Sequence, residues 1–261
     1  MNLKGRVALI TGASSGIGWQ TALAFAEKGA RLAVTARSAD KLHELADLIR
    51  KKGGECFVAP ADVTDADSVR QAAELVGNHY ARIDILVNNA GFGVFKPVLE
   101  MDMQTVEEMM NVNYFGMVRF IQAVVPIMIR QNFGHVVNVA SLAGFMAAPT
   151  HGAYAATKFA VIGLSEALRE EVRPQGILVS TVNPGPIDTP FFERADLNHI
   201  PPIARRFMLK PDKVAQSIVR AIEQEIPQVV IPGGMVPVIK IKALMPNLFA
   251  RGTGKLYRRK P

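Results

Sequence analysis

The chain has 261 residues, of which 49% are apolar and 20% are charged, and this composition excludes an intrinsically disordered protein. A single cysteine, Cys56, excludes an internal disulfide bond and favours a reducing compartment. The start of the sequence lacks the pattern of a signal peptide, and no uninterrupted apolar run reaches the roughly 18–20 residues of a membrane-spanning helix, so we expect a cytoplasmic protein.

The net charge of +7 is concentrated at the C-terminal end of the sequence. Residues 240–261 contain seven lysines and arginines and no acidic residue. The whole chain has 30 basic and 23 acidic residues, so residues 1–239 hold 23 of each and are neutral. Because the body carries no excess positive charge, no nucleic-acid partner is expected.

The first predicted strand, residues 7–10, leads into a glycine-rich loop and then a helix over residues 19–28. This is the context of a dinucleotide-binding fingerprint, because small residues let the backbone approach a pyrophosphate and the helix N-terminus offers N–H groups. Such a loop also occurs as a purely structural turn; its place between this strand and this helix favours cofactor binding. The residues assigned to the cofactor here are Gly12, Ser14, Ser15, Gly16, Ile17 and Gly18.

The second predicted strand, residues 31–35, ends where an NAD site presents an acidic residue to the ribose hydroxyls. This sequence has Ala36 and Arg37 there instead. A guanidinium suits a 2′-phosphate, which favours NADP(H), and the alternative is an ordinary surface arginine. Ser15 is not basic, so the preference for NADP(H) depends on Arg37 alone.

Polar or small residues also follow the next predicted strands, 56–59, 83–87 and 136–139. Asp62 and Val63 follow the first of them, where the carboxylate either accepts a hydrogen bond from an adenine amino group or shapes the turn. The residues 88–91, which include Asn89, Ala90 and Gly91, follow the second, and Ser141 follows the third. These positions suit a ligand lying across the carboxyl edge of a parallel sheet.

Strands alternate with helices along the whole chain. Further helices are predicted over residues 40–52, 65–78, 105–129, 154–172 and 213–225, and further strands over 177–182 and 229–231. The alternation predicts an α/β protein with a single three-layered, doubly wound parallel sheet of the Rossmann type. We therefore assign residues 1–235 to one cofactor-binding and catalytic domain, with residues 191–209 as a flap over the site, and residues 236–261 to an extension.

The segment Tyr154-Ala-Ala-Thr-Lys158 suggests acid/base chemistry on a carbonyl/alcohol pair. At a spacing of four in a helix, Tyr154 and Lys158 share one face. A free phenol has a pKa of about 10, and a nearby ammonium is expected to lower it. The Ser141 hydroxyl is then able to hold a substrate oxygen against the phenol. Alone the pair is weak evidence, because the same spacing occurs by chance on helix surfaces.

Together these landmarks resemble the short-chain dehydrogenase/reductase family over residues 5 to about 230. Residues 11–18 match its cofactor motif, and residues 88–91 match its sheet-stabilising motif. The resemblance implies a seven-stranded Rossmann sheet, hydride transfer at nicotinamide C4, and NADP(H) where Arg37 stands. It also implies a nicotinamide-contacting segment that contains Pro184, Gly185, Ile187 and Thr189.

The resemblance further implies a catalytic tetrad of Asn113, Ser141, Tyr154 and Lys158. Tyr154 would be the general acid in reduction and the base in oxidation, and Lys158 would lower its pKa and hold the nicotinamide ribose. Ser141 would orient the substrate oxygen, and Asn113 would anchor a water of the proton relay.

The favoured function is NADPH-dependent reduction of an apolar ketone or aldehyde. The alternatives are oxidation of a secondary alcohol in the same site and a non-catalytic NADP(H)-sensing module, against which the intact tetrad counts. The predicted substrate-pocket residues are apolar or aromatic: Phe92, Phe95, Leu142, Phe145, Met146 and Phe191, with Val94, Pro186 and Phe192 as further candidates.

The extension after residue 235 departs from the family pattern. It is apolar and basic, which puts the usual tetramer in doubt and favours a dimer. The same composition suits reversible contact with an anionic membrane surface, or packing on the chain's own body or on a partner subunit. Pro237 and Pro246 interrupt a long helix there, which weakens the membrane interpretation.

Overall fold

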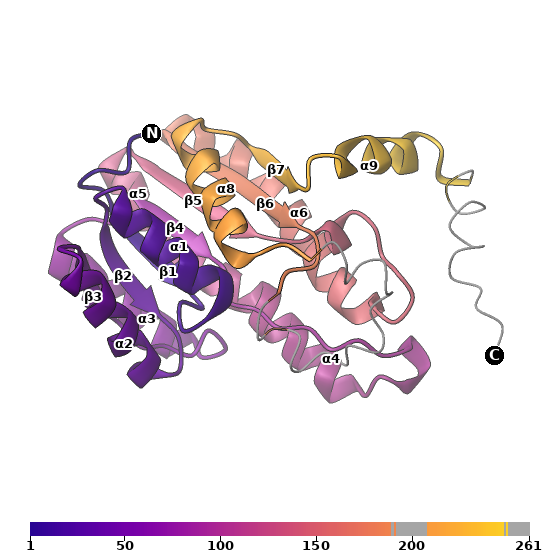
Figure 1. Cartoon of the computed structure of the whole chain (residues 1–261), viewed down its shortest axis with the longest axis horizontal. Coiled ribbons are helices and arrows are strands. Elements are labelled where there is room, and N and C mark those ends of the chain that lie inside the picture. The colour runs from indigo at the N-terminus through magenta and orange to yellow at the C-terminus, as the bar shows by residue number, and fades with distance from the viewer. Residues whose placement is uncertain (189–190, 192–207, 248, 250–261) are drawn as a thin grey trace.

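The structure, a computed structural model, describes residues 1–188, 191, 208–247 and 249. Seven strands form one parallel sheet in the order β3-β2-β1-β4-β5-β6-β7, which confirms the predicted doubly wound α/β fold (Figure 1). The strands are β1 (Val7–Thr11), β2 (Arg31–Thr35), β3 (Glu55–Val58), β4 (Ile85–Asn88), β5 (Gly134–Val139), β6 (Ile177–Pro184) and β7 (Gln228–Ile231).

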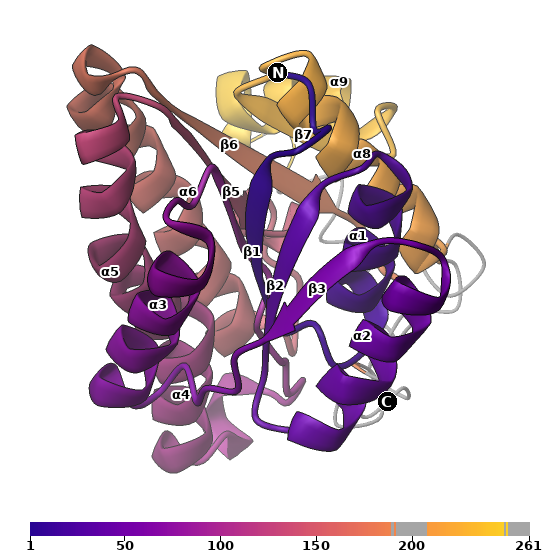
Figure 2. The same ribbon diagram turned by 90° about the vertical axis from the view of Figure 1, so that its left-hand side faces the viewer.

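Helices cover both faces of the sheet, and each face has its own buried apolar core (Figure 2). On one face lie α1 (Gly16–Glu27), α2 (Ala39–Lys51) and α8 (Pro211–Glu223). The other face is covered by α3 (Ala66–Tyr80), α5 (Gly116–Gln131) and α6 (Gly152–Val172). Burial on both faces explains why strands such as β1 and β4 read as continuous apolar runs.

Strand order reverses between β1 and β4, because the chain adds β2 and β3 on one side of β1 and β4 to β7 on the other. The loops that follow β1 and β4 therefore diverge at the carboxyl edge of the sheet. In open α/β sheets this divergence leaves a crevice in which ligands bind.

Two helices differ from their predicted limits. Helix α1 begins at Gly16, inside the glycine-rich loop, and not at Trp19. Glycine is a poor helix former, so the sequence pattern places the start too late. The predicted helix 105–129 is α4 (Met103–Met110) and α5 joined by a π-helical turn, η2 (Asn111–Phe115). Such turns insert one extra residue and are frequent at functional sites.

The continuous helical run 103–131 is long and apolar enough to span a membrane by length and composition. Its apolar residues have another explanation here. Phe120, Val124 and Met128 are fully buried in the core between α5 and the sheet. The run is therefore a core helix of the folded domain.

Short 3-10 turns are present at η1 (Val98–Glu100), η3 (Leu142–Gly144) and η4 (Arg173–Gln175), and a last helix, α9 (Met235–Leu244), follows β7. Pro237 does not interrupt α9, whereas Pro246 lies beyond its end. Pro237 lies in its first turn, where a missing N–H breaks no helical hydrogen bond, and Pro246 follows its end.

His135 is a fully buried titratable group within the sheet. Its Nε2 lies 2.8 Å from Ser180 Oγ, and that hydroxyl donates to the Ile226 carbonyl at 2.6 Å. Ser180 therefore accepts from Nε2–H, and Nδ1 has no hydrogen-bond partner in the part of the chain that the structure describes. Burial lowers the pKa of His135 to about 4, because a charged imidazolium would be poorly solvated there.

His135 should make the folded protein acid-sensitive. Its pKa is lower in the folded than in the unfolded chain, so the unfolded state binds the proton first and stability falls as pH drops below about 6.5. Urea unfolding should lose about 2 kcal/mol between pH 7.5 and pH 5 through this group. His135→Gln should flatten the dependence by that amount, whereas His43→Gln on the exposed face of α2 should not. Equal slopes for wild type and His135→Gln would contradict the assignment.

Candidate active site

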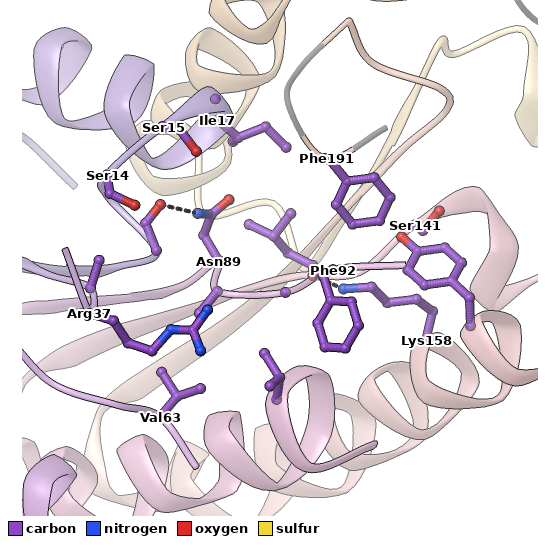
Figure 3. Close-up of a pocket in the computed structure, with 18 of the residues that line it drawn as sticks. Ser14, Ser15, Ile17, Arg37, Val63, Asn89, Phe92, Ser141, Lys158 and Phe191 are labelled. Carbon is purple, nitrogen blue, oxygen red and sulfur yellow. Dashed lines mark hydrogen bonds between the residues drawn. The ribbon is translucent and has the colours of Figure 1, made fainter. Parts of the chain in front are cut away.

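A cavity of about 630 Å³ opens at the carboxyl edge of the sheet, where the strand order reverses. It runs from Arg37 to Phe191, and Figure 3 shows these two residues at opposite ends. Most residues predicted to bind cofactor or substrate line it: Gly12, Ser14, Ser15, Gly16, Ile17, Arg37, Asp62, Val63, Asn89, Ala90, Gly91, Phe92, Ser141, Tyr154, Lys158, Pro184, Gly185, Ile187 and Phe191. Thr189 and Phe192 lie outside the described residues, as does most of the predicted flap.

The glycine-rich loop needs its glycines for close approach of backbones. A Cβ on Gly18 would lie 2.3 Å from the Gly12 carbonyl oxygen, and a Cβ on Gly12 would lie 2.8 Å from Ala90 Cα. Gly12 and Gly16 also have positive φ angles, +65° and +56°. Gly18 does not line the cavity; it packs the start of α1 against the loop. The N-terminus of α1 consequently faces the cavity with N–H groups suited to an anion.

Asn89 and Thr11 fasten this loop to the end of β4. Asn89 Nδ2 donates to the carbonyls of Thr11 at 3.0 Å and Gly12 at 3.2 Å (Figure 3). Thr11 Oγ1 accepts from the backbone N–H groups of Asn89 and Ala90 at 2.9 and 3.0 Å. These hydrogen bonds fix the distance between the loop after β1 and the loop after β4, which form the two sides of the crevice.

At the end of the cavity beside β2 and β3, Arg37 and Asp62 carry opposite charges. Asp62 Oδ1 accepts from the Thr64 N–H and hydroxyl, both at 2.8 Å. Burial raises the pKa of Asp62, but the Thr64 hydrogen bonds and the charges of Arg37 and Arg119 outweigh it and hold the pKa below its ordinary value. Within the described residues, no carboxylate forms an ion pair with Arg37.

At the other end, η3 and α6 bring Ser141, Tyr154 and Lys158 together. Ser141 caps η3 by accepting from Ala143 N–H at 3.1 Å, and its hydroxyl, which lies beside the Tyr154 phenol, donates to the Pro184 carbonyl at 3.4 Å. Lys158 Nζ donates to the Val139 carbonyl at 3.0 Å and lies 5.8 Å from the centroid of the Tyr154 ring. Both side chains of the pair are buried.

The pKa of the phenol departs from the sequence expectation. Burial raises the pKa of Tyr154 to about 12, and the neighbouring Ser141 hydroxyl opposes this rise. Burial also lowers the pKa of Lys158 to about 8. The expected lowering of the Tyr154 pKa by Lys158 is therefore wrong for this structure, because desolvation of the enclosed phenolate dominates and the amine is directed at Val139.

Asn113 reaches the site through the π-helical turn. Its Oδ1 accepts from Phe92 N–H at 2.9 Å, and its Nδ2 donates to the Phe92 carbonyl at 2.8 Å and to Thr157 Oγ1 at 3.1 Å. Thr157 in turn donates to the Tyr154 carbonyl at 2.8 Å. The amide thus ties the turn after β4 to α6 between Tyr154 and Lys158. The water-anchoring role of Asn113 stays a prediction.

Two of the predicted substrate residues, Phe92 and Phe191, face the cavity (Figure 3). Phe95 is buried behind them, 5.7 Å from the Tyr154 ring and stacked on His151 at 4.1 Å. Leu142, Phe145 and Met146 follow Ser141 but are not among the cavity-lining residues. Phe145 instead packs against the core between α5 and α6, because the η3 turn directs the chain away from the cavity.

Several residues that line the cavity were not predicted from the sequence to belong to the site. Most of these follow strand ends and are small or polar, which is the only hint the sequence offers: Ser38, Ala61, Thr64, Val139 and Ala140. Glu108, Asn111 and Val112 come from α4 and η2. Their approach depends on how α4 and η2 pack over the crevice, which local sequence does not encode.

Comparison with known proteins agrees with this geometry. The sequence profile of the short chain dehydrogenase family matches residues 6–199. A relative from Thermotoga maritima, named 3-oxoacyl-(acyl-carrier-protein) reductase, is 37% identical over 227 residues, which are 84% of this chain and 90% of the relative.

Solved structures show the same fold. An alcohol dehydrogenase from the archaeon Thermococcus sibiricus, complexed with 5-hydroxy-NADP, matches with a TM-score of 0.78 at 30% identity, over 87% of this chain and 95% of that chain. A short chain dehydrogenase/reductase from Burkholderia phymatum, complexed with NAD, has a TM-score of 0.85 at 24% identity and covers 100% of this chain and 99% of its own, a likeness of fold alone. The profile match and the Thermotoga relative show that this chain belongs to the short-chain dehydrogenase/reductase family and is an NAD(P)-dependent oxidoreductase.

Proposed function

We propose that this oxidoreductase uses NADPH to reduce the carbonyl group of a neutral, apolar ketone or aldehyde. The observation that carries the proposal is a buried Tyr154 phenol beside Ser141 and Lys158, in an aromatic pocket at one end of a cavity that has Arg37 at the other.

The residues present fit a dinucleotide phosphate. The close approach of Gly12 and Gly18 leaves the N-terminus of α1 open to a pyrophosphate. Arg37, which has no ion-pair partner among the described residues, would hold a 2′-phosphate beside Ser38. The second Asp62 oxygen is suited to an adenine amino group, because only Oδ1 binds Thr64. Bound NADPH would supply the hydride.

The protonation state of Tyr154 favours reduction over oxidation. With a pKa of about 12, the phenol is protonated at neutral pH and is able to donate a proton to a substrate oxygen. Alcohol oxidation would instead need the phenolate, which burial disfavours. The Ser141 hydroxyl lies beside the phenol and would donate a hydrogen bond to the same substrate oxygen by turning from the Pro184 carbonyl. A protein that only sensed NADP(H) would not need this arrangement.

The substrate end of the cavity suits a neutral molecule. Phe92 and Phe191 line it, and the described basic residues lining the whole cavity are Arg37 and Lys158. Lys158 is bound to Val139, and Arg37 lies at the far end, so neither is available to a substrate carboxylate. The Thermotoga relative is named as a reductase of a 3-oxoacyl group on an acyl carrier protein, which supports reduction of a ketone.

Tyr154→Phe tests the activity. The wild type should oxidise NADPH when supplied with one or more members of a panel of apolar ketones and aldehydes, followed at the nicotinamide absorbance band. Loss of the phenolic hydroxyl in Tyr154→Phe should lower the rate of NADPH oxidation by a factor of roughly 10²–10⁴, the usual contribution of a general acid. Tyr80→Phe, which removes a hydroxyl far from the cavity, should keep the activity. Unchanged turnover in Tyr154→Phe would exclude the mechanism.

Arg37→Ala tests the preference for NADPH over NADH. The variant should lose roughly 1.5–3 kcal/mol of NADPH binding, the range of a charge-assisted hydrogen bond, and bind NADH almost as before. Lys41→Ala removes the same charge from an exposed position on α2 and serves as the control. Calorimetric titration of both cofactors measures the effect, and an equal loss for NADPH and NADH would make Arg37 structural.

Thr157→Val tests the link between Asn113 and α6. Removing the hydroxyl takes away one of the two hydrogen bonds that Asn113 Nδ2 donates and the bond from Thr157 to the Tyr154 carbonyl, while the bond from Nδ2 to the Phe92 carbonyl remains. The loss of roughly 0.5–1.5 kcal/mol per hydrogen bond should appear mainly in kcat. NADPH affinity should change little, and Thr157→Ser should restore turnover. If serine and valine reduce kcat equally, the hydroxyl does not position the site.

A further inference from the structure

Helix α9 (Met235–Leu244) is apolar on every side, yet none of its residues is buried. Figure 1 shows it extending from β7 away from the sheet. It contains two lysines and no acidic residue. A helix that is apolar on all sides is normally buried against other protein or lipid on more than one side.

One face of α9 rests on the chain's own body. Met235, Val238, Ile239 and Lys242 are half-buried on this inner face. Lys242 Nζ donates to the Phe145 carbonyl and lies 5.4 Å from the Phe159 ring centroid. These contacts fix which side of the helix points outward.

The outward side of α9 forms one continuous strip. Val236, Lys240 and Leu244 follow one another at a spacing of four, and Ile241 and Met245 lie beside them. Leu244 is 82% exposed, Met245 50%, Ile241 49% and Val236 36%. We call these five residues the outer strip; it has four large apolar side chains around one lysine.

The charge of the C-terminal region distinguishes between the possible binding partners of the outer strip. Beyond residue 249 the sequence adds five more basic residues and no acidic one, while residues 1–239 are neutral. A second copy of the strip would bring like charges together, and the neutral body offers no excess of negative charge. Nucleic acid would satisfy the charge but leave the apolar side chains without contacts. An anionic lipid bilayer provides acyl chains for the apolar side chains and negative headgroups for the basic ones.

We propose that the outer strip of α9 binds the surface of an anionic membrane, with its apolar side chains at the acyl boundary and Lys240 among the headgroups. The contact is peripheral and reversible, because it depends on one short helix and on charge. It does not depend on the proposed reaction.

Vesicle co-sedimentation of the full chain tests the proposal. The protein should pellet at low salt with vesicles of phosphatidylcholine and phosphatidylserine in a three-to-one ratio, and should be released as salt rises. Leu244→Glu should lower the partition coefficient about tenfold or more, the effect of withdrawing one buried leucine. Lys240→Gln should lower it about fivefold, the effect of one basic residue at an anionic surface.

Leu75→Glu is the matched control, because Leu75 is 52% exposed on α3, at the opposite end of the molecule. The Leu75→Glu variant should sediment with the vesicles to the same extent as the wild type. Unchanged melting temperatures would show that both glutamate variants fold. Absence of sedimentation by the wild type at low salt would overturn the proposal, as would equal losses in Leu244→Glu and Leu75→Glu. A dimer in analytical ultracentrifugation that Leu244→Glu abolishes, without vesicle binding, would show that a second copy covers the strip.

Discussion

The close contact between the glycine-rich loop and the end of β4 is the constraint on which the site depends. Gly12, Gly18 and Ala90 approach so closely that a Cβ on either glycine would overlap backbone atoms. Asn89 and Thr11 fasten the same contact with hydrogen bonds. Because α1 begins in this loop, the contact sets both the direction of its N-terminus and the width of the crevice.

Desolvation governs the chemistry at the other end of the crevice. Burial makes the Tyr154 phenol a weaker acid and Lys158 a weaker base than either would be in water. The aromatic side chains that bury the phenol also line the pocket that we propose for an apolar substrate. In that proposal, the same burial favours an apolar substrate and keeps the Tyr154 phenol protonated.

The loop after Ser141 connects this site to the C-terminal helix. Ser141 lies beside the Tyr154 phenol, and four residues later the Phe145 carbonyl accepts a hydrogen bond from Lys242 of α9. If α9 lies on a membrane, the substrate end of the molecule is held near that surface. An apolar substrate would then have a short path from lipid to pocket, which connects the two proposals physically although each is tested separately.

The sequence by itself determined the parallel α/β sheet, the glycine loop and the approach of Ser141 to Tyr154 and Lys158, because apolar periodicity and short motifs act locally. Only the tertiary structure decided that Phe191 faces the cavity while Phe145 does not, and that Thr157 joins Asn113 to α6. It also reversed the expected pKa shift of Tyr154. Burial and long-range hydrogen bonds depend on residues far apart in the chain, and no local pattern records how they meet.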